Sequence, residues 1–159
     1  MQPIDDKDKK ILDALQTNAS VAAETLGEQI GLSTTSVQRR IKRLASDRVI
    51  ERQACVLSPE KLGCGLRCVV GIALDVEHGD VLARFRALLE REPRVQQSYY
   101  VAGEWDFIVI VLAKDMDDYE AMTQRLFFGN PYVKRFTTNV VMKPHIVGLQ
   151  VPMELAAVD

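Results

Sequence analysis

The spacing of hydrophobic residues divides the chain into two parts. In residues 4–46 it follows a helical period, as in the stripe formed by Ile11, Leu12 and Leu15. From residue 66 onward, apolar runs typical of strands alternate with amphipathic segments. The sequence therefore predicts an α+β protein, helical at the N-terminus and mixed at the C-terminus.

Three helices are predicted in the first part, because capping and chain-breaking residues stand at their expected ends. Gly31 should end the second helix in a left-handed conformation, and the third should run to about Ser46. The expected N-caps are Asp5 or Asp6 for the first helix, Ser20 for the second, and Ser33 or Thr34 for the third.

The second part predicts a ferredoxin-like βαββαβ domain, a split βαβ unit. Strands are expected at 66–76, 95–102, 107–113 and 133–142, and helices at 80–92 and 115–128. A short extended segment, "VIERQACVL", and the turn-rich "SPEKLGCG" connect the two parts. We expect a helix-turn-helix domain at 1–52, a linker that includes the extended strand at 53–65, the ferredoxin-like domain at 66–150 and a tail at 151–159.

Two predicted strands are apolar on both sides. "FIVIVLA" has no polar residue, and "CVVGIAL" has almost none. When helices cover one face of an antiparallel sheet, strands that meet water on the other face alternate between apolar and polar residues. The two predicted helices can cover one face, so we expect a second subunit on the other and hence a homodimer.

The charge is unevenly distributed. The whole chain carries a net charge of −2, but residues 34–52 hold six Arg or Lys against two acids. Residues 66–159 hold 10 basic and 13 acidic residues. A local basic patch on a mildly acidic protein favours site-specific contact with a polyanion.

The third predicted helix has the properties of a DNA recognition helix. Val37, Ile41 and Leu44 form one stripe that should pack inward, which leaves a basic face with small hydroxyl residues near its start. An Arg one turn into the helix can bind a guanine edge, while Arg40 lies on the flank, beside phosphate or an acid. The candidate DNA-binding residues are Ser33, Thr34, Thr35, Ser36, Gln38, Arg39, Lys42 and Arg43.

Other chemistry has little support in the sequence. The cysteines Cys55, Cys64 and Cys68 form no C-x-x-C pair, and we expect reduced thiols. His78 and His145 lack a zinc-like spacing to them, which predicts no metal and no cofactor. The charged N-terminus and the absence of a long apolar run predict a cytoplasmic protein without a membrane partner.

Four stretches resemble the Lrp/AsnC family of transcription regulators, the feast/famine proteins. The resemblance extends from Ile4 to Leu149 and rests on the order and spacing of "IDDKDKKILDALQTNA", "LGEQIGLSTTSVQRRIKRLASDRVI", "YYVAGEWDFIVIV" and "VVMK". It implies a RAM/ACT-like C-terminal domain that dimerises and binds a small effector, usually an amino acid. It also implies a tetramer of dimers, an octamer, that wraps or bends DNA.

The resemblance places the effector pocket at the "GEWD" loop. Gly103 would permit the tight turn with a positive φ, and Asp106 would receive the α-ammonium group of the effector. The candidate effector-binding residues are Tyr100, Ala102, Gly103, Glu104, Trp105, Asp106, Thr137, Thr138 and Asn139. Alternatively, the loop is only a hairpin turn with Trp105 packed on a neighbouring dimer.

Three positions depart from the pattern of the family. Asn139 stands where an aromatic residue is frequent, Trp105 is bulkier than many residues at its place, and Arg48 replaces a usual glycine. The first two change which effector fits, or mean that no effector binds. Arg48 follows the recognition helix, where it predicts a different turn and an added phosphate contact.

Two further functions remain open beside a ligand-responsive DNA-binding regulator. Some haem-pathway decarboxylases resemble this family in both domains, but a tetrapyrrole enzyme needs basic residues and histidines around its substrate. Here the basic residues gather on the predicted recognition helix and only two histidines exist, so we expect no enzyme. The other alternative is a ligand-binding protein without DNA contacts, against which Arg39 and its neighbours argue.

Overall fold

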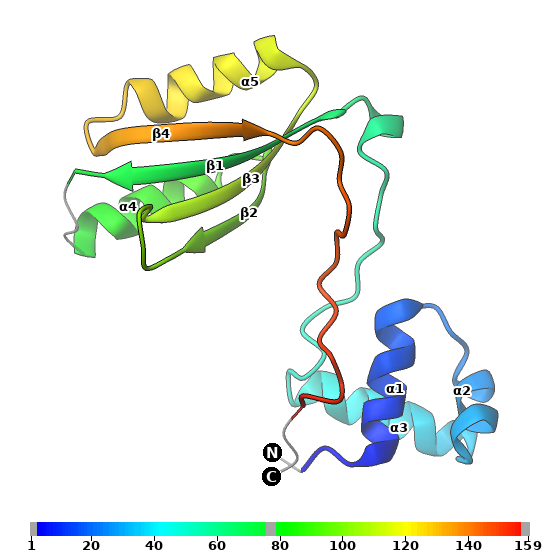
Figure 1. Ribbon diagram of the computed structural model, residues 1–159. Coiled ribbons are helices and arrows are strands. Elements are labelled where there is room, and N and C mark those ends of the chain that lie inside the picture. The colour runs from blue at the N-terminus through cyan, green and yellow to red at the C-terminus, as the bar shows by residue number, and fades with distance from the viewer. Residues whose placement is uncertain (1–2, 76–78, 157–159) are drawn as a thin grey trace. The chain divides into compact units, whose positions relative to one another are not determined.

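The chain folds into two compact units in a computed structural model that describes residues 3–75 and 79–156 (Figure 1). One unit contains the residues up to Val56 together with the segment that begins at Ile146, and the other contains Leu57–His145. His78, which lacks a zinc-like spacing to the cysteines, lies outside the described residues.

The first unit is built from three helices, as predicted: α1 (Asp6–Thr17), α2 (Ala23–Ile30) and α3 (Thr34–Ser46). Asp5 caps α1 in a reciprocal capping box with Asp8, and the Ser33 hydroxyl caps α3 by accepting from the Ser36 amide. The expectation that Ser20 caps α2 is wrong, because the N-cap residue is Ala22, which makes no side-chain cap bond.

The core of the helical unit confirms the predicted inward stripes. Ile11, Leu26, Val37 and Leu44 are at most 1% exposed, and partly buried neighbours pack around them. Full burial of such a side chain contributes roughly 1.5–3 kcal/mol. Since all three helices supply residues to this one cluster, the outward face of α3 is fixed by packing on α1 and α2.

The turn between α2 and α3 depends on two glycines. Gly31 ends α2 with φ 68° and ψ 48°, the left-handed conformation that was predicted. A Cβ on Gly27 would lie 2.5 Å from the Leu32 carbonyl oxygen, so only glycine lets the chain return this closely. The two helices therefore meet in the tight arrangement typical of a helix-turn-helix.

The C-terminal segment also belongs to the helical unit, and the sequence pattern did not indicate this. The Gln16 side chain on α1 donates to the Val151 carbonyl and accepts from the Val151 amide. Lys9 donates to the Ala156 carbonyl, and Met153 packs against the helical core. These contacts attach the end of the chain to α1.

The second unit has the predicted ferredoxin-like order (Figure 1). Its elements are β1 (Leu66–Leu74), α4 (Gly79–Glu90), β2 (Val95–Tyr100), β3 (Phe107–Ala113), α5 (Met116–Thr123) with a π-helical end η2 (Gln124–Phe128), and β4 (Val133–Val140). The strands form one antiparallel sheet in the order β2-β3-β1-β4. A short 3-10 helix, η1 (Glu60–Leu62), lies in the linker. The expected strand in the linker is wrong, because residues 53–65 form no strand.

The two faces of this sheet differ in burial. Val70 of β1 and Val109 of β3 pack with residues of α4 and α5 in one buried core. The opposite face, which we call the open face, carries the alternating residues of the same strands. Along β3 the pattern alternates strictly between buried and half-buried residues, so Ile108, Ile110 and Leu112 lie on the open face. An apolar face thus remains without helices of this unit over it.

Candidate nucleic-acid interface and effector loop

The outward face of α3 presents polar and basic side chains. Val37 and Leu44 are buried beneath it, while Thr35, Arg39 and Lys42 are exposed. The remaining predicted DNA-binding residues near the start of the helix are also accessible, with Ser33, Thr34 and Gln38 exposed and Ser36 half-buried. Backbone N–H groups at a helix start and small hydroxyls can donate to phosphate oxygens.

The four basic side chains of α3 fall into two pairs. Arg40 donates to Asp5 at 2.7 Å and to Asp8 at 2.8 Å, and Arg43 forms a salt bridge with the other oxygen of Asp8. Arg39 and Lys42 have no acidic partner within the described part of the chain. The helix therefore carries two charge-paired guanidinium groups beside two open cations.

Asp8 is the centre of the paired group. Its side chain is 0% exposed, whereas Arg40 and Arg43 remain 23% and 24% exposed. Partial burial acts to raise the pKa of the Asp5 carboxyl, but the hydrogen bonds from the Asp8 amide and from Arg40 outweigh it and lower that pKa. The bonds to Asp8 and Asp5 in turn raise the pKa of Arg40, so this group stays ionised.

A hollow of about 630 Å³ lies beside the middle of α3. It is lined by Pro3, Asp5, Arg39, Arg40 and Arg43. Three guanidinium groups against one carboxylate give the hollow a net positive charge, which suits a phosphate group. The structure thus places Arg39 and Arg43, both predicted from the sequence, around one concave surface.

In the second unit, the "GEWD" loop joins β2 to β3. Ala102, Gly103 and Glu104 are exposed, and Gly103 has a φ of 155°, the positive value that was predicted. The Asp106 amide donates to the Ile72 carbonyl, and its carboxylate accepts from the Leu74 amide at 2.7 Å. Asp106 therefore attaches the loop to the end of β1 and has one carboxylate oxygen engaged with the backbone.

Trp105 lies flat on the open face of the sheet. A Cβ on Gly71 would approach the indole to 2.7 Å, so the ring rests directly on the backbone of β1. The Arg135 guanidinium lies over the ring at 4.2 Å from its centroid and pairs with Glu104 at 3.2 Å. Trp105 thus contacts both the backbone of β1 and the guanidinium of Arg135 beside the loop.

The structure separates the predicted effector-binding residues between two faces. Thr137 pairs with Gly71 and Asn139 pairs with Val69, which places both on the open face beside Trp105. Thr138 points to the opposite face, where its hydroxyl lies 2.5 Å from that of Tyr119 in α5. Burial acts to raise the pKa of Tyr119 and outweighs this hydrogen bond, which lowers it.

Tyr100 likewise lies on the helix-covered face. Its ring packs against Phe107 at 5.3 Å between centroids, and the Arg86 guanidinium lies over it at 5.1 Å. The sequence-based set of effector residues therefore contains one group around Trp105 and two members, Tyr100 and Thr138, on the helix-covered face, where Tyr100 remains 48% exposed.

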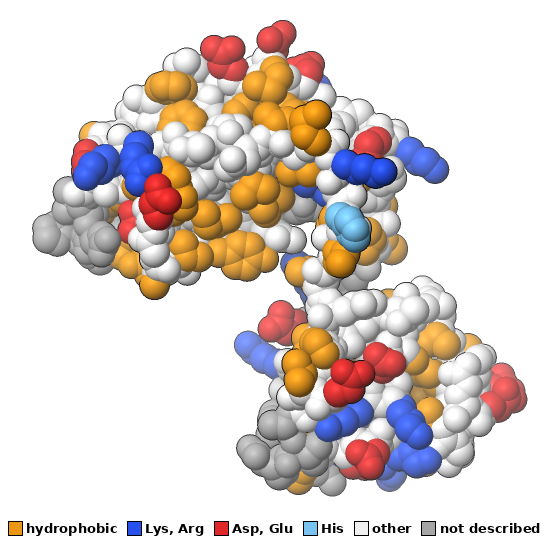
Figure 2. Space-filling view, viewed as in Figure 1, with side chains coloured by type: hydrophobic (Ala, Val, Ile, Leu, Met, Phe, Trp, Pro, Cys, Tyr) orange, Lys and Arg blue, Asp and Glu red, His pale blue; other side chains and the backbone are white. Residues whose placement is uncertain are grey.

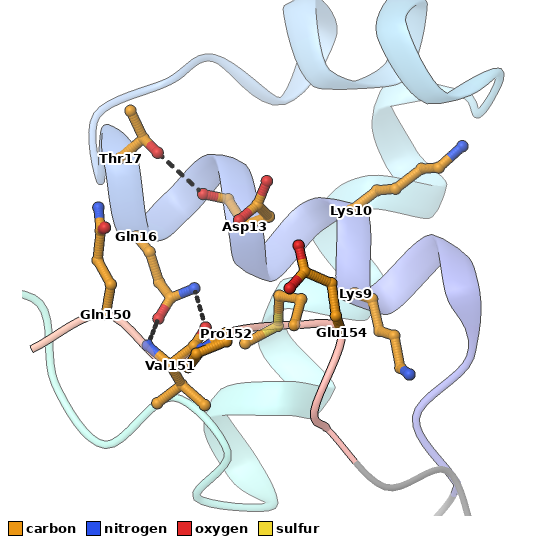
Figure 3. A pocket seen from close by; sticks show the side chains of 10 residues that line it. Lys9, Lys10, Asp13, Gln16, Thr17, Gln150, Val151, Pro152 and Glu154 are labelled. Atoms are coloured by element: carbon orange, nitrogen blue, oxygen red, sulfur yellow. Dashed lines mark hydrogen bonds between the residues drawn. The ribbon is translucent and has the colours of Figure 1, made fainter.

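A second hollow, of about 520 Å³, lies in the helical unit between α1 and the C-terminal segment (Figure 3). Figure 3 shows the Gln16 side chain bonded to Val151, and Lys9, Lys10 and Glu154 are among the residues that line the hollow. None of the predicted DNA-binding or effector-binding residues lines it. It is a surface groove formed where the end of the chain crosses α1.

Residues 3–75 and 79–156 were also compared with the patterns of a metal site, a membrane helix and a disulfide. No set of three His, Cys, Asp or Glu side chains there gathers in a way that could hold a metal ion. No helix in that part of the chain is long and apolar enough to cross a membrane. The three cysteines are free thiols, and burial raises the pKa of Cys68.

Comparison with known proteins gives the same division into two parts. Residues 4–45 match the AsnC-type helix-turn-helix domain, and residues 67–149 match the Lrp/AsnC ligand binding domain. The chain is 40% identical over 152 residues to an uncharacterized HTH-type transcriptional regulator of Sinorhizobium fredii, a match that covers 96% of this chain and 90% of that protein.

Solved structures of similar proteins share the whole fold. An AsnC family transcriptional regulator from Agrobacterium tumefaciens matches with a TM-score of 0.89 and 27% identity over 94% of this chain and 97% of its own. A transcriptional regulator of Neisseria meningitidis in complex with L-methionine matches with a TM-score of 0.88 and 25% identity, over 94% of this chain and 96% of its own.

A helix-turn-helix unit joined to a ferredoxin-like ligand-binding unit defines a DNA-binding transcriptional regulator that responds to a ligand. The chain belongs to the Lrp/AsnC family of these regulators. The resemblance seen in the sequence is therefore confirmed, and so are the predicted fold class and the predicted function.

Proposed function

We propose that the outward face of α3 enters the major groove of double-stranded DNA. The carrying observation is that Arg39 and Lys42 stand exposed and without an acidic partner in the described residues, one turn beyond a helix start rich in hydroxyls. Arg39 then binds a base edge, and Lys42 contacts the phosphate backbone. Ser33, Thr34, Thr35, Ser36 and Gln38 complete the surface, and Arg43 lies at its rim with its charge paired to Asp8.

The test is the salt dependence of DNA binding. The double variant Arg39→Ala/Lys42→Ala should bind DNA more weakly and flatten the plot of log K against log[salt] by about 0.9 for each phosphate that the variant no longer binds. The matched control is Arg84→Ala/Lys134→Ala, which removes the same charge from exposed positions in the other unit. If the two double variants behave alike, α3 does not contact DNA.

We further propose an amino acid as the effector, bound beside the "GEWD" loop. The Neisseria relative crystallised with L-methionine supports this class of ligand. Trp105, Thr137 and Asn139 share the open face next to the loop, and the second oxygen of Asp106 can accept from an α-ammonium group. Ala102, Gly103 and Glu104 would supply loop contacts, while Tyr100 and Thr138 would act from beneath the sheet.

Trp105 makes this proposal directly measurable, because it is the only tryptophan in the chain. Titration with each of the twenty amino acids should change the tryptophan emission for the true effector. At a concentration about 100 times its Kd, that effector should also stabilise the protein by roughly 2.7 kcal/mol. Asp106→Asn should abolish both signals, and a panel without any response would argue against an amino acid.

We also propose that the protein is a homodimer through the open face. Ile108, Ile110 and Leu112 are half-buried there, and the segments that flank the sheet unit carry fully open apolar side chains such as Val56 (98%) and Met142 (94%). Exposed hydrophobic side chains are visible over this unit in Figure 2. Apolar surface of this extent favours coverage by a second copy.

Assembly connects the two sites. A dimer carries two copies of α3, and effector binding at the open face would change how dimers associate, including the octamer that the family resemblance implies. A coupling of roughly 1–3 kcal/mol changes DNA occupancy about 5- to 150-fold. We propose no catalytic role, since the family consists of regulators, and we place the protein in the cytoplasm with its DNA.

A further inference from the structure

The buried carboxylate of Asp8 is the least expected feature of the DNA-binding unit. It is 0% exposed and is held by two arginines that both come from α3. A carboxylate is costly to bury, and an apolar residue in its place would pack as well or better. Asp8 also accepts from the Asp5 amide in the capping box of α1, but that bond does not require two arginines from α3, so their pairing with Asp8 calls for another explanation.

We propose that Asp5 and Asp8, which we call the acidic clamp, position Arg40 and Arg43 and keep their charges from DNA phosphates. The clamp and its two arginines sum to zero charge, and the salt bridges of Arg40 with Asp5 and Asp8 and of Arg43 with Asp8 join the start of α1 to α3. Only Arg39 and Lys42 then remain as open cations on the helix. This proposal rests on the proposed contact between α3 and DNA.

The consequence concerns selectivity for sequence. Binding to random DNA is electrostatic, so every additional open cation strengthens it, whereas binding to an operator also depends on contacts with bases. By withholding two of the four cations of α3, the clamp weakens binding to random DNA more than it weakens binding to the operator. The clamp residues therefore act as positioning residues that set the ratio between the two affinities.

The hollow beside α3 supports this assignment. Arg39, Arg40 and Arg43 line it together with Asp5, so a phosphate that reached Arg39 would lie close to the two paired guanidinium groups. Without the clamp, those groups could bind the same phosphate or its neighbours. The distances of 2.7 and 2.8 Å from Arg40 to the two carboxylates show charge-assisted bonds that hold it in place.

The experiment measures the affinity of the full chain for two DNAs over a range of salt. One is an operator obtained by selection from a random pool with the wild-type protein, and the other is a random duplex of equal length. Asp8→Asn keeps the shape of the side chain and removes its charge. We expect the plot of log K against log[salt] to steepen by about 0.9 per released cation, and the operator-to-random ratio to fall severalfold.

Two further variants separate positioning from stability. Glu92→Gln in the other unit removes a buried carboxylate that is also held by two arginines, Arg94 and Arg125, and should leave the ratio and the slope unchanged. Asp5→Asn retains the N-cap, because Asn caps as well as Asp, and so keeps the fold if Asp8→Asn does not. It should shift both quantities in the same direction by a smaller amount.

A folded Asp8→Asn protein with the wild-type ratio and slope would overturn the proposal, and so would an Asp5→Asn protein with both values unchanged if Asp8→Asn does not fold. Failure of the proposed function has a different result. In that case Arg39→Ala/Lys42→Ala leaves DNA binding as strong as in its control, whatever the clamp variants do.

Discussion

At the scale of single residues, backbone strain is found at Arg48, shortly after the end of α3. Arg48 has a φ of 58°, and it is the only residue other than glycine with a positive φ in the described ranges. Its amide donates to the Ala45 carbonyl, which holds it in the turn that ends α3. The sequence flagged this position because Arg48 replaces a usual glycine, but the chain keeps the conformation that glycine would prefer.

Relief of this strain should stabilise the protein. Arg48→Gly should raise the free energy of unfolding by about 0.5–1 kcal/mol, because a left-handed residue with a Cβ costs roughly 1–2 kcal/mol and glycine costs part of that in the unfolded chain. Arg48→Ala is the matched control, since it removes the same side chain and keeps the Cβ. Urea denaturation followed by circular dichroism measures both, and equal stabilities would contradict this account.

A second prediction at the residue scale concerns the packing of the Trp105 ring on Gly71. Gly71→Ala places a Cβ 2.7 Å from the indole, so the ring must move away from the sheet. We expect the emission of this single tryptophan to shift to longer wavelength as the ring becomes more exposed. Gly65→Ala is the control, because a Cβ there meets no atom within 4 Å. Unchanged emission in Gly71→Ala would mean that the ring does not rest on β1.

At the scale of secondary-structure elements, a salt bridge connects the start of β2 to α5. Arg94, just before β2, pairs with Asp118 of α5 at 2.5 Å and with the buried Glu92 at 2.9 Å. The bond from Arg94 is the main cause that lowers the pKa of Asp118 to about 2. For Glu92, burial raises the pKa, but the bonds from Arg94 and Arg125 outweigh burial and lower it.

These shifts predict acid sensitivity in a defined range. A carboxyl with a lowered pKa in the folded state contributes stability above its unfolded pKa, about 3.9 for Asp, and that stability is lost as the pH falls toward 2. Asp118→Asn should therefore flatten the dependence of the melting temperature on pH between about 4 and 2. Asp117→Asn, on the same turn of α5 but exposed, should keep the wild-type dependence. Identical pH profiles for the two variants would contradict the role of Asp118.

The helices and sheet strands could be predicted from the sequence, because the hydrophobic periodicity that marks each of them lies within its own residues. Each predicted helix and sheet strand is present, because caps such as Asp5 and Ser33 and runs such as "FIVIVLA" carry their own signal. The separation of Thr138 from Thr137 also follows from the two-residue period of a strand, but the set implied by the resemblance kept them together.

Contacts between elements were not predictable in the same way. Asp8 meets Arg43 only because α1 packs across α3, and nothing in the local sequence of either helix shows which acid faces which base. The attachment of the C-terminal segment to Gln16 is similar, since 135 residues separate the bonded groups. Ser20 was expected to cap α2, yet the helix begins three residues later, after Ala22.

At the scale of the whole molecule, the open face of the sheet is expected to join two copies of the chain. Ile110→Glu places a charge in the middle of this face, where burial against a second copy would be costly. We expect a loss of dimers in sedimentation velocity experiments. Ala83→Glu adds the same charge to an exposed position of α4 and should leave the mass unchanged. An unchanged mass for a folded Ile110→Glu protein would move the interface elsewhere.

The measurement that tests the central claim most directly is the affinity of Arg39→Ala for operators that differ by single base pairs. If Arg39 binds a base edge from α3, its loss should cost about 1–3 kcal/mol on the selected operator and abolish discrimination at one base pair. Discrimination at the other positions should remain as in the wild-type protein. A variant that still distinguishes every base pair as the wild type does would show that Arg39 does not read DNA.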